Sequence, residues 1–195
     1  MRLGIDLDGV VADFDRGWMS RYREEFGTDP RPAHAEPGTP RMIWDGMHRL
    51  THFPDMQAFW DWVHSRRLFR HLDLIPGARE GLDKLAADGH DIVILTAKPD
   101  RAIHDTLYWI SEQRLPTREI HFIRAKYRVP CDVYLDDSPL VVPALVRHRP
   151  EALVCRMVAP WNEPVPGAVD VTGWPDFVDV VNRRGAELAA AGQVR

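Results

Sequence analysis

Four aspartates stand where apolar runs of the sequence end. Asp6 and Asp8 follow the first run, and Asp136 and Asp137 close a run much later in the chain. If these runs are parallel strands, their carboxyl ends meet at one edge of a sheet and the four carboxylates lie close together. Carboxylates at close range repel one another, so at neutral pH they need a compensating cation. Because an all-oxygen cluster with water favours Mg²⁺, the four residues are predicted to form a Mg²⁺ site.

The same edge would hold the groups that phosphoryl transfer needs, which are a nucleophile, a proton carrier and donors to the phosphate oxygens. Asp6 is the candidate nucleophile, since a carboxylate can form an aspartyl-phosphate. Asp8 can protonate the leaving oxygen and later activate water. Lys126 can bridge the phosphate and the nucleophile. Asp6, Asp8 and Lys126 are therefore the candidate catalytic residues.

Further residues at this edge are candidates for binding the phosphate. Thr96 ends the apolar run DIVILT and offers a hydroxyl beside backbone N–H groups. Gly9 allows the backbone to turn tightly after Asp8. Lys98 either supplies a cation near the substrate or is a solvent-exposed surface residue, and the sequence leaves both alternatives open. The candidate phosphate-binding set is Asp6, Asp8, Gly9, Thr96, Ala97, Lys98 and Lys126.

Strand and helix patterns alternate along most of the chain. Short apolar runs predict strands at 2–7, 91–96, 119–126, 132–137 and 152–158. Helical spacing predicts helices at 14–26, from the Pro76-Gly77 turn to about 88, and at 100–114, 139–148 and 175–191. Strands that alternate with helices predict an α/β fold, in which right-handed crossovers connect a parallel sheet flanked by helices.

One aromatic-rich block, residues 14–75, interrupts this alternation. Asp13 is predicted to cap the first helix of the block, which stops at Gly27, although a polar role beside the metal is the alternative. A proline-rich loop at 28–41 follows, and then two helices within 42–69 that are separated at Phe53-Pro54. The predicted organisation is a core of residues 1–13 and 76–182, a helical insertion at 14–75, and a helix end or tail at 183–195.

Composition excludes several classes of protein. A chain of 195 residues is predicted to be one domain, or one domain with an insertion. Its 45% hydrophobic and 28% charged residues are ordinary for a globular protein, and its net charge of −4 is not that of a nucleic-acid-binding protein. The sequence lacks the ~20 consecutive apolar residues of a membrane helix. An acidic residue at position six of MRLGIDLDGV argues against a signal peptide, and two cysteines fit the cytoplasm, where we expect this protein.

The motifs resemble those of a known family. Residues 6–14, DLDGVVADF, resemble the first motif of the haloacid dehalogenase (HAD) superfamily, and in particular the pattern D-x-D-G-V-x-A-D-F of its 5′(3′)-deoxyribonucleotidase branch. Ile94-Leu95-Thr96 resembles the second motif, Lys126 the third and Leu135-Asp136-Asp137 the fourth. Ile75-Pro76-Gly77-Ala78 resembles the return from the cap of that family.

The resemblance implies a Rossmann-like core with a small helical cap inserted after the first motif. It implies hydrolysis of phosphate monoesters that depends on Mg²⁺ and passes through phospho-Asp6. It also implies that the metal is held by the Asp6 carboxylate, the Asp8 backbone carbonyl and the Asp136/Asp137 pair, without indicating which of the two binds directly. The implied substrate is a small nucleotide, with neither a nucleic-acid polymer nor a membrane as partner, and a homodimer is compatible with the size of the chain.

Aromatic residues near the cap are candidates for the substrate pocket. In the family, the phenylalanine at the position of Phe14 helps to wall the base pocket, which suggests a stacking role here. Phe69, close to the return from the cap, and Trp44 are the other candidates. Most cap aromatics are expected to pack the two short helices instead. Trp161 and Asn162 either border the pocket or pack a loop.

Departures from the family pattern leave the substrate open. Ala97 stands where mammalian members have serine, and Ser138 stands where they have a basic residue. A sugar phosphate or a biosynthetic intermediate is therefore the alternative to a nucleotide. A catalytically silent phosphate-binding module is disfavoured because the full set of catalytic residues is present. A dehalogenase is disfavoured because it has no leaving alkoxide for Asp8 to protonate.

Two other patterns have a weaker link to chemistry. His48 and His52 have a spacing that can bind zinc on a helix, but no third ligand is evident, so a surface face is the preferred interpretation. Cys131 and Cys155 are expected to be buried thiols rather than a redox pair.

Overall fold

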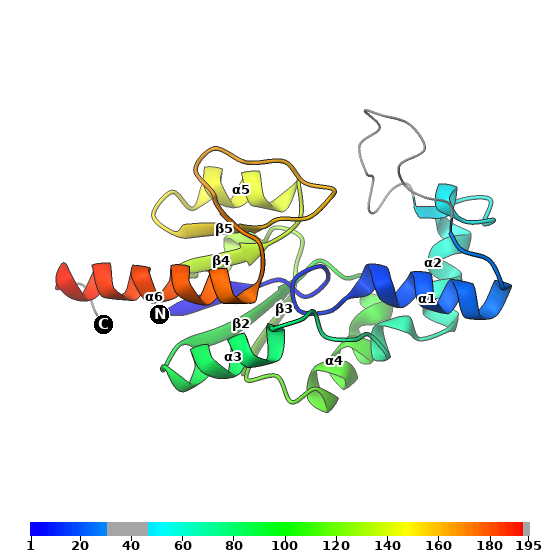
Figure 1. The fold of residues 1–195 in the computed structure, drawn as a ribbon, viewed down its shortest axis with the longest axis horizontal. Helices are drawn as coiled ribbons and strands as arrows, with labels where there is room; N and C mark the ends of the chain where they lie inside the picture. Colours follow the sequence, from blue (N-terminus) through cyan, green and yellow to red (C-terminus); the bar gives the residue numbers. More distant parts are fainter. Residues whose placement is uncertain (31–46, 193–195) are drawn as a thin grey trace.

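Six parallel strands form one sheet in the computed structural model, which describes residues 1–30 and 47–192 (Figure 1). They are β1 (Arg2–Ile5), β2 (Asp91–Thr96), β3 (Glu119–Phe122), β4 (Val133–Asp136), β5 (Leu153–Met157) and β6 (Val169–Val171). Their order in the sheet is β3-β2-β1-β4-β5-β6. The first strand is therefore central, and the order of the strands reverses between β1 and β4, which is where open α/β sheets bind ligands. The predicted α/β fold is confirmed.

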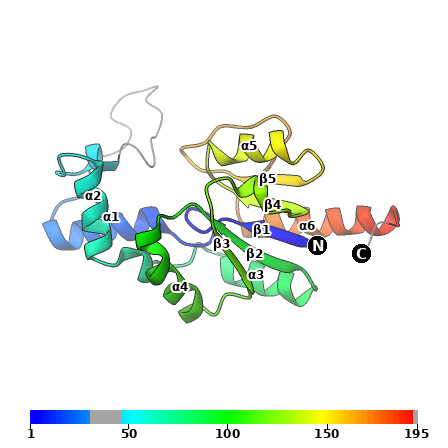
Figure 2. The same cartoon turned by 180° about the vertical axis from the view of Figure 1, so that it is seen from behind.

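Helices cover both faces of the sheet because alternate residues of each strand point to opposite sides. The α-helices are α1 (Phe14–Phe26), α2 (Met56–Ser65), α3 (Ala78–Ala87), α4 (Ile103–Glu112), α5 (Val141–His148) and α6 (Trp174–Ala190). In β2, Ile92 and Ile94 join the hydrophobic cluster that contains residues of α3 and α6. Val93 and Leu95 join a second cluster with residues of α5. Figure 2 shows the same layers from behind.

Helices α1 and α2 lie beyond the carboxyl ends of the strands, away from the two chain termini (Figure 1). Asp13 accepts a hydrogen bond from Arg16 N, and Gly27 adopts a left-handed φ of 67°, so the predicted cap and end of α1 are confirmed. The second part of the insertion consists of α2 and two short 3₁₀ turns, Met47–Leu50 and Leu68–Arg70. Residues 42–46 of the predicted helical stretch lie outside the described residues. The extent 14–75 remains our proposal for the insertion.

The insertion is bound to the core through α4. Asp61 of α2 pairs with Arg101, with an N···O distance of 2.7 Å, and Arg67 pairs with Asp105 of α4. The indole of Trp109, on the same helix, donates to Leu72 O at 2.7 Å. These contacts hold the insertion over the edge of the sheet that carries the aspartates.

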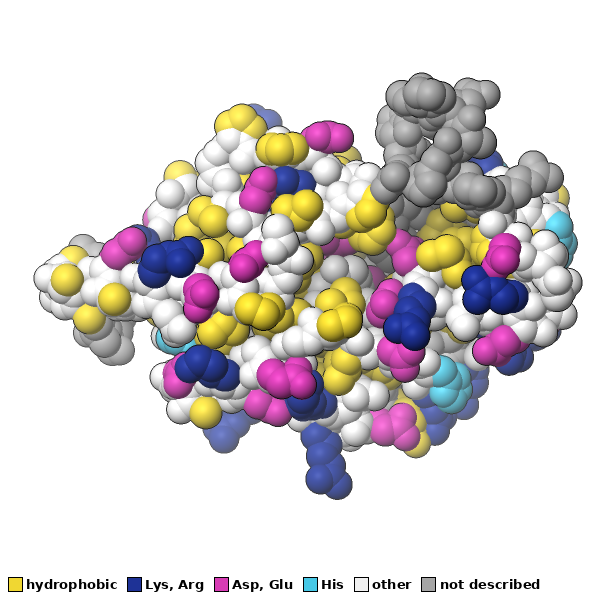
Figure 3. Space-filling view, in the orientation of Figure 1, with side chains coloured by type: hydrophobic (Ala, Val, Ile, Leu, Met, Phe, Trp, Pro, Cys, Tyr) yellow, Lys and Arg dark blue, Asp and Glu magenta, His cyan; other side chains and the backbone are white. Residues whose placement is uncertain are grey.

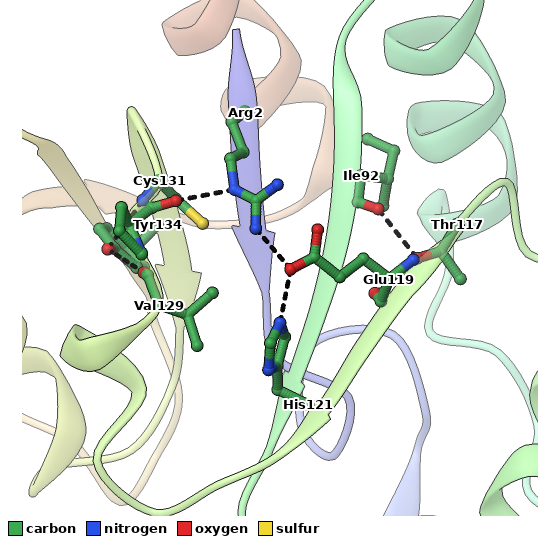
Figure 4. A network of polar contacts seen from close by, with 9 residues as sticks. Arg2, Ile92, Thr117, Glu119, His121, Val129, Cys131 and Tyr134 are labelled. Atoms are coloured by element: carbon green, nitrogen blue, oxygen red, sulfur yellow. Dashed lines mark hydrogen bonds and ion pairs between the residues drawn. The ribbon is translucent and has the colours of Figure 1, made fainter.

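A polar network ties the amino ends of the strands together (Figure 4). Arg2 of β1 donates to Glu119 of β3 at 2.6 Å and to Pro130 O, just before β4, at 2.8 Å. Glu119 also meets the imidazole of His121 at 2.6 Å. Hydrogen bonds from Arg2 and His121 lower the pKa of Glu119 to about 2. This network lies at the opposite end of the sheet from the aspartates, where it holds β1, β3 and the start of β4 together.

Two features differ from the sequence-based expectation, and a third agrees with it. β3 ends at Phe122 rather than at 126, because the chain turns through the 3₁₀ segment Lys126–Arg128. β6 was not predicted, since it has three residues of which two are exposed. The predicted closing helix at 175–191 is confirmed as α6, and of the two interpretations for residues 183–195 the helix end holds for 183–190.

The described residues show how surface charge, apolar helices and the two cysteines are distributed. Basic and acidic side chains are interspersed over the face shown in Figure 3, without a large basic patch. Among the described residues, none of the helices combines the length and hydropathy that crossing a bilayer requires. Both cysteines are free and buried as expected, and burial raises the pKa of Cys131 to about 11 and of Cys155 to about 12.

Candidate active site

The structure brings the four aspartates together at the carboxyl ends of β1 and β4. Asp6, Asp8, Asp136 and Asp137 are between 1% and 7% exposed. Carboxylate oxygens of Asp6, Asp136 and Asp137 all lie within 4.8 Å of one another. β1 and β4 are neighbours at the reversal of strand order, which explains how residues about 130 positions apart in the chain meet.

Lys126 lies between two of these carboxylates. Its Nζ is 2.7 Å from Asp6 Oδ1 and 2.7 Å from Asp136 Oδ2. Burial alone would lower the pKa of this lysine, but the charges of Asp136 and Asp6 raise it above its ordinary value. Lys126 is therefore protonated at neutral pH and offers a fixed positive charge beside the candidate nucleophile.

Lys98 forms a second buried ion pair in the site. Its Nζ lies 2.7 Å from Asp8 Oδ1 and 4.6 Å from the centre of the Phe69 ring. The side chain of Lys98 is 4% exposed, so the alternative of a solvent-exposed lysine is excluded. Burial raises the pKa of Asp8, and the charge of Lys98 opposes that rise. Asp8 is thus held by a cation and is biased by burial toward its protonated form.

The charges in this cluster do not balance. Four buried aspartates meet only two lysines in the described part of the chain, which leaves two negative charges in excess if all are ionised. Burial and the charges of Asp6 and Asp136 hold the pKa of Asp137 well above its usual range. A buried oxygen cluster with this excess charge fits a divalent cation such as Mg²⁺.

The two neighbouring aspartates differ in how their oxygens are used. Asp136 has both carboxylate oxygens occupied, Oδ2 by Lys126 at 2.7 Å and Oδ1 by the backbone N–H of Ser138 at 2.9 Å. Asp137 Oδ2 accepts from the indole N–H of Trp161 at 2.9 Å. No donor of residues 1–30 or 47–192 is bonded to Asp137 Oδ1. Asp137 Oδ1 is therefore available to bind a cation, whereas both carboxylate oxygens of Asp136 are already hydrogen-bonded.

A tight turn after Asp8 allows Asp137 to approach the backbone. The carbonyl of Leu7 accepts hydrogen bonds from the N–H groups of Val11 and Ala12, both at 2.8 Å. Gly9 has a φ of +77°, and a Cβ placed on it would lie 2.1 Å from Asp137 Oδ2. Glycine is required here both for the left-handed backbone and for the space that the carboxylate fills.

A cavity of about 340 Å³ opens beside Asp8 and Asp137. Its walls include Phe14, the return segment Ile75-Pro76 and Trp161. A separate depression of about 560 Å³ lies on the side of Lys98 and also includes Ala97, Arg101 and Arg124. The cavity with Phe14 therefore opens onto Asp8 and Asp137, whereas the depression with Arg124 borders Lys98 and none of the four aspartates.

Comparison with known proteins identifies the family. Residues 1–186 match the model of a family described as 5′ nucleotidase, deoxy (Pyrimidine), cytosolic type C protein. The chain belongs to this family. It is similar, with 30% identity over 78% of this chain and 77% of the relative, to a protein of Chlorobaculum tepidum that is provisionally named a 5′(3′)-deoxyribonucleotidase. It is 28% identical, over 71% of this chain and 73% of the relative, to the 5′(3′)-deoxyribonucleotidase of Clostridium acetobutylicum.

Solved structures agree on the fold. A HAD family hydrolase of Deinococcus radiodurans R1 superposes with a TM-score of 0.59 at 17% identity, and the match covers 94% of this chain and 96% of that one. The HAD-like fold predicted from the motifs is confirmed. As a member of the 5′-deoxynucleotidase family, the chain is an enzyme of the phosphatase type.

Two positions at which this member departs from the family pattern are accounted for structurally. Ala97 is exposed at the rim of the depression beside Lys98. Ser138 starts the turn into α5, where its Oγ accepts from the N–H of Leu140 at 3.3 Å and of Val141 at 3.4 Å. Ser138 therefore has a local structural partner that a basic side chain would lack.

The candidate pocket residues are placed unequally in this family member. Phe14 is buried, borders the cavity and stacks on Phe69 with ring centres 5.3 Å apart. Phe69 is buried as well, with the Lys98 ammonium over its ring. Trp44 lies outside the described residues. Contact of Phe14 and Phe69 with substrate stays a prediction.

The weaker histidine pattern gains no support. His52 Nδ1 and the Tyr22 hydroxyl are 2.8 Å apart within the aromatic cluster of the insertion. Among the described residues, the groups of three or more metal-ligating side chains do not include His48 or His52. Trp161 and Asn162, for which the sequence left two alternatives, both bond to Asp137.

Proposed function

We propose that this protein is a Mg²⁺-dependent hydrolase of phosphate monoesters that acts through a phospho-Asp6 intermediate, with deoxyribonucleoside or ribonucleoside monophosphates as substrates. The observation that carries the proposal is the contact of the protonated Lys126 with Asp6 inside a buried cluster of carboxylates. A divalent cation would neutralise the excess negative charge of this cluster. Membership in the 5′-deoxynucleotidase family supports the nucleotide as substrate class.

The residues of the site have distinct roles in two steps. In the first, a carboxylate oxygen of Asp6 forms a bond to phosphorus while the bond from phosphorus to the leaving oxygen breaks, and Asp8 gives its proton to that oxygen. In the second, Asp8 takes a proton from water, the water oxygen bonds to phosphorus and the bond to Asp6 breaks, which releases phosphate. The raised pKa of Asp8 favours the protonated form that the first step uses.

Positive groups hold the phosphate during both steps. Lys126 faces Asp6 and can contact a phosphate oxygen beside it. Thr96 ends β2 at the same edge and offers its hydroxyl. A Mg²⁺ ion would be held by the carboxylates of Asp6 and Asp137 and the backbone carbonyl of Asp8. It would supply positive charge to the phosphate oxygens.

A second substrate class is kept because of two residues. Ala97 lacks the hydroxyl, and Ser138 lacks the basic group, that mammalian members carry at these two positions. A sugar phosphate or a biosynthetic intermediate is therefore the alternative substrate. The catalytic residues and their roles are the same in both cases. The pairing of Lys126 with Asp6 and of Lys98 with Asp8 disfavours a silent binding module.

The test is a phosphate-release assay with the full chain and Mg²⁺. The panel contains 5′- and 3′-deoxyribonucleoside monophosphates, ribonucleoside monophosphates and common sugar phosphates. We expect the highest kcat/KM on a nucleoside monophosphate and loss of turnover in Asp6→Asn, which keeps the size of the side chain. A preference for sugar phosphates selects the second class. Full activity of Asp6→Asn contradicts the nucleophile assignment.

A further inference from the structure

A short loop after β5 contacts Asp137, whose Oδ1 has no hydrogen-bond donor among the described residues. The indole Nε1 of Trp161 donates to Asp137 Oδ2 at 2.9 Å. The side-chain amide of Asn162 donates to the backbone carbonyl of Asp137 at 2.7 Å and to Met157 O at 2.8 Å. Two consecutive residues therefore hold both the backbone and the carboxylate of Asp137.

Asn162 is itself fixed by a buried arginine. Arg156 of β5 is 3% exposed, and its Nη1 donates to Asn162 Oδ1. The charge of Arg156 is balanced by Asp170 of β6, which accepts from Nε at 2.8 Å and from Nη2 at 2.6 Å. β5 and β6 pair with Arg156 opposite Asp170. A continuous chain of hydrogen bonds thus runs from β6 through β5 to Asp137.

The hydrogen bonds in the cluster leave single carboxylate oxygens available. Asp6 Oδ1 is taken by Lys126 at 2.7 Å and by the N–H of Leu7 at 2.7 Å. Asp136 has both of its oxygens occupied. Asp137 has Oδ2 held by Trp161. Each carboxylate that can bind a cation would therefore bind it through one oxygen rather than through both.

This restriction bears on which divalent cation the site prefers. Mg²⁺ requires near-octahedral coordination with short bonds, whereas Ca²⁺ accepts six to eight oxygens and often binds a carboxylate through both oxygens. We propose that Trp161 restricts Asp137 to one-oxygen binding and thereby makes the site select Mg²⁺ over Ca²⁺. The proposal rests on the Mg²⁺ site of the proposed function, and it makes Trp161 a positioning residue, with Asn162 and Arg156 as its support.

The experiment compares two variants that each lose an indole N–H donor to a carboxylate. Trp161→Phe removes the bond to Asp137. Trp62→Phe is the matched control, because the Trp62 indole donates to Glu25 at 3.2 Å within the insertion, away from the aspartates. Dissociation constants of Mg²⁺ and Ca²⁺ are measured by titration calorimetry on the metal-stripped full chain, without substrate.

We expect Trp161→Phe to bind Mg²⁺ about 10-fold more weakly, the size of effect that loss of a hydrogen bond to a metal ligand has elsewhere. The affinity for Ca²⁺ should fall less, or rise, because Asp137 can then bind through both oxygens. The ratio of the two constants therefore changes in Trp161→Phe and stays at the wild-type value in Trp62→Phe. Trp161→His, which keeps a ring N–H donor, should restore part of the Mg²⁺ preference.

The outcomes separate the two proposals. If the wild-type chain binds neither cation, the Mg²⁺ site of the proposed function is wrong. If the wild type binds Mg²⁺ and Trp161→Phe keeps the wild-type preference, the role of Trp161 is overturned while the metal site stands. Should Trp161→Phe fail to fold by circular dichroism, Trp161→Leu, which also lacks the N–H donor, takes its place, and a wild-type preference in that folded variant overturns the proposal.

Discussion

Lys98 and Asp8 form a buried ion pair, with Nζ 2.7 Å from Oδ1, across 90 positions of the chain. The pair joins the loop after β2 to the turn after β1. It matters for chemistry because Asp8 must give up a proton in one proposed step and take one in the next. The charge of Lys98 lowers the pKa of Asp8 while burial raises it, so the lysine limits how far Asp8 stays protonated.

Lys98→Met is expected to slow the second step more than the first. Without the cation, burial raises the pKa of Asp8 further, so the ionised form that activates water becomes rarer at neutral pH. The rise of kcat with pH should move to higher pH, and rapid mixing should reveal a burst of leaving group before slow turnover. Lys84→Met is the control, because Lys84 pairs with Asp88 at an exposed site. An unshifted pH profile in Lys98→Met would falsify this role.

Gly9→Ala is expected to disrupt the site beyond its effect on the backbone. An added Cβ meets Asp137 Oδ2 at 2.1 Å and also strains a residue with φ of +77°. Gly89→Ala is the matched control, since Gly89 has a φ of +84° and nothing within 4 Å of the added Cβ. Gly89→Ala should lose about 1 kcal/mol of unfolding free energy in urea titrations because of its left-handed backbone. Gly9→Ala should lose more, because its Cβ also overlaps Asp137 Oδ2. Turnover should fall at least about tenfold only in Gly9→Ala, and equal activities would contradict the close approach of Asp137.

Asp15→Asn is expected to stabilise the protein at neutral pH. Burial raises the pKa of Asp15 to about 6, although the indole of Trp18 donates to it and opposes the rise. The folded state therefore binds this proton more tightly than the unfolded chain, and the wild type loses stability as pH rises from about 4 through 6. Asparagine carries no charge and keeps the acceptor oxygen.

The gain should reach about 2 kcal/mol at pH 7.5 and shrink to about 0.5 kcal/mol or less near pH 4, where Asp15 is protonated in the folded state and partly protonated in the unfolded chain. Urea unfolding of the two proteins at both pH values measures this difference. Asp179→Asn, at an exposed position of α6, should show no comparable gain. A gain that is the same at both pH values would disprove the assignment to the Asp15 charge.

Mg²⁺ is expected to stabilise the fold as well as to support turnover. At 100 times its dissociation constant, a ligand that binds only the folded state adds about 2.7 kcal/mol. Melting curves with EDTA and with excess Mg²⁺ should therefore differ by several degrees. Asp137→Asn should lose most of that difference, whereas an unchanged Mg²⁺ effect would remove Asp137 from the metal site.

Local patterns predicted much of the fold. The limits of α1 follow from Asp13 and Gly27, and the limits of β2 from an unbroken apolar run. β6 was missed because a strand of three residues with two exposed side chains has no hydrophobic pattern of its own. It exists because β5 offers it an edge and Arg156 attracts Asp170.

The sequence predicts the position of a site residue when that residue ends a strand. It does not predict the position when contacts with residues far away in the chain determine it. The convergence of Asp6 with Asp136 and Asp137 follows from the parallel sheet. The burial of Lys98 does not, since it depends on Asp8 and on the ring of Phe69, far away in sequence. The bonds of Trp161 and Asn162 to Asp137 depend in the same way on the path of the loop after β5.

The central place of β1 has a consequence for how the chain matures during synthesis. Leu3 pairs with Ile92 on one side and with Val133 on the other, so both neighbours of the first strand are translated long after it. Until those two strands emerge from the ribosome, β1 has no strand to pair with at either edge. Pairing between segments this far apart in sequence is also slow. The centre of the sheet can therefore be completed only after β4 has been synthesised, which makes its formation a late event in the folding of this enzyme.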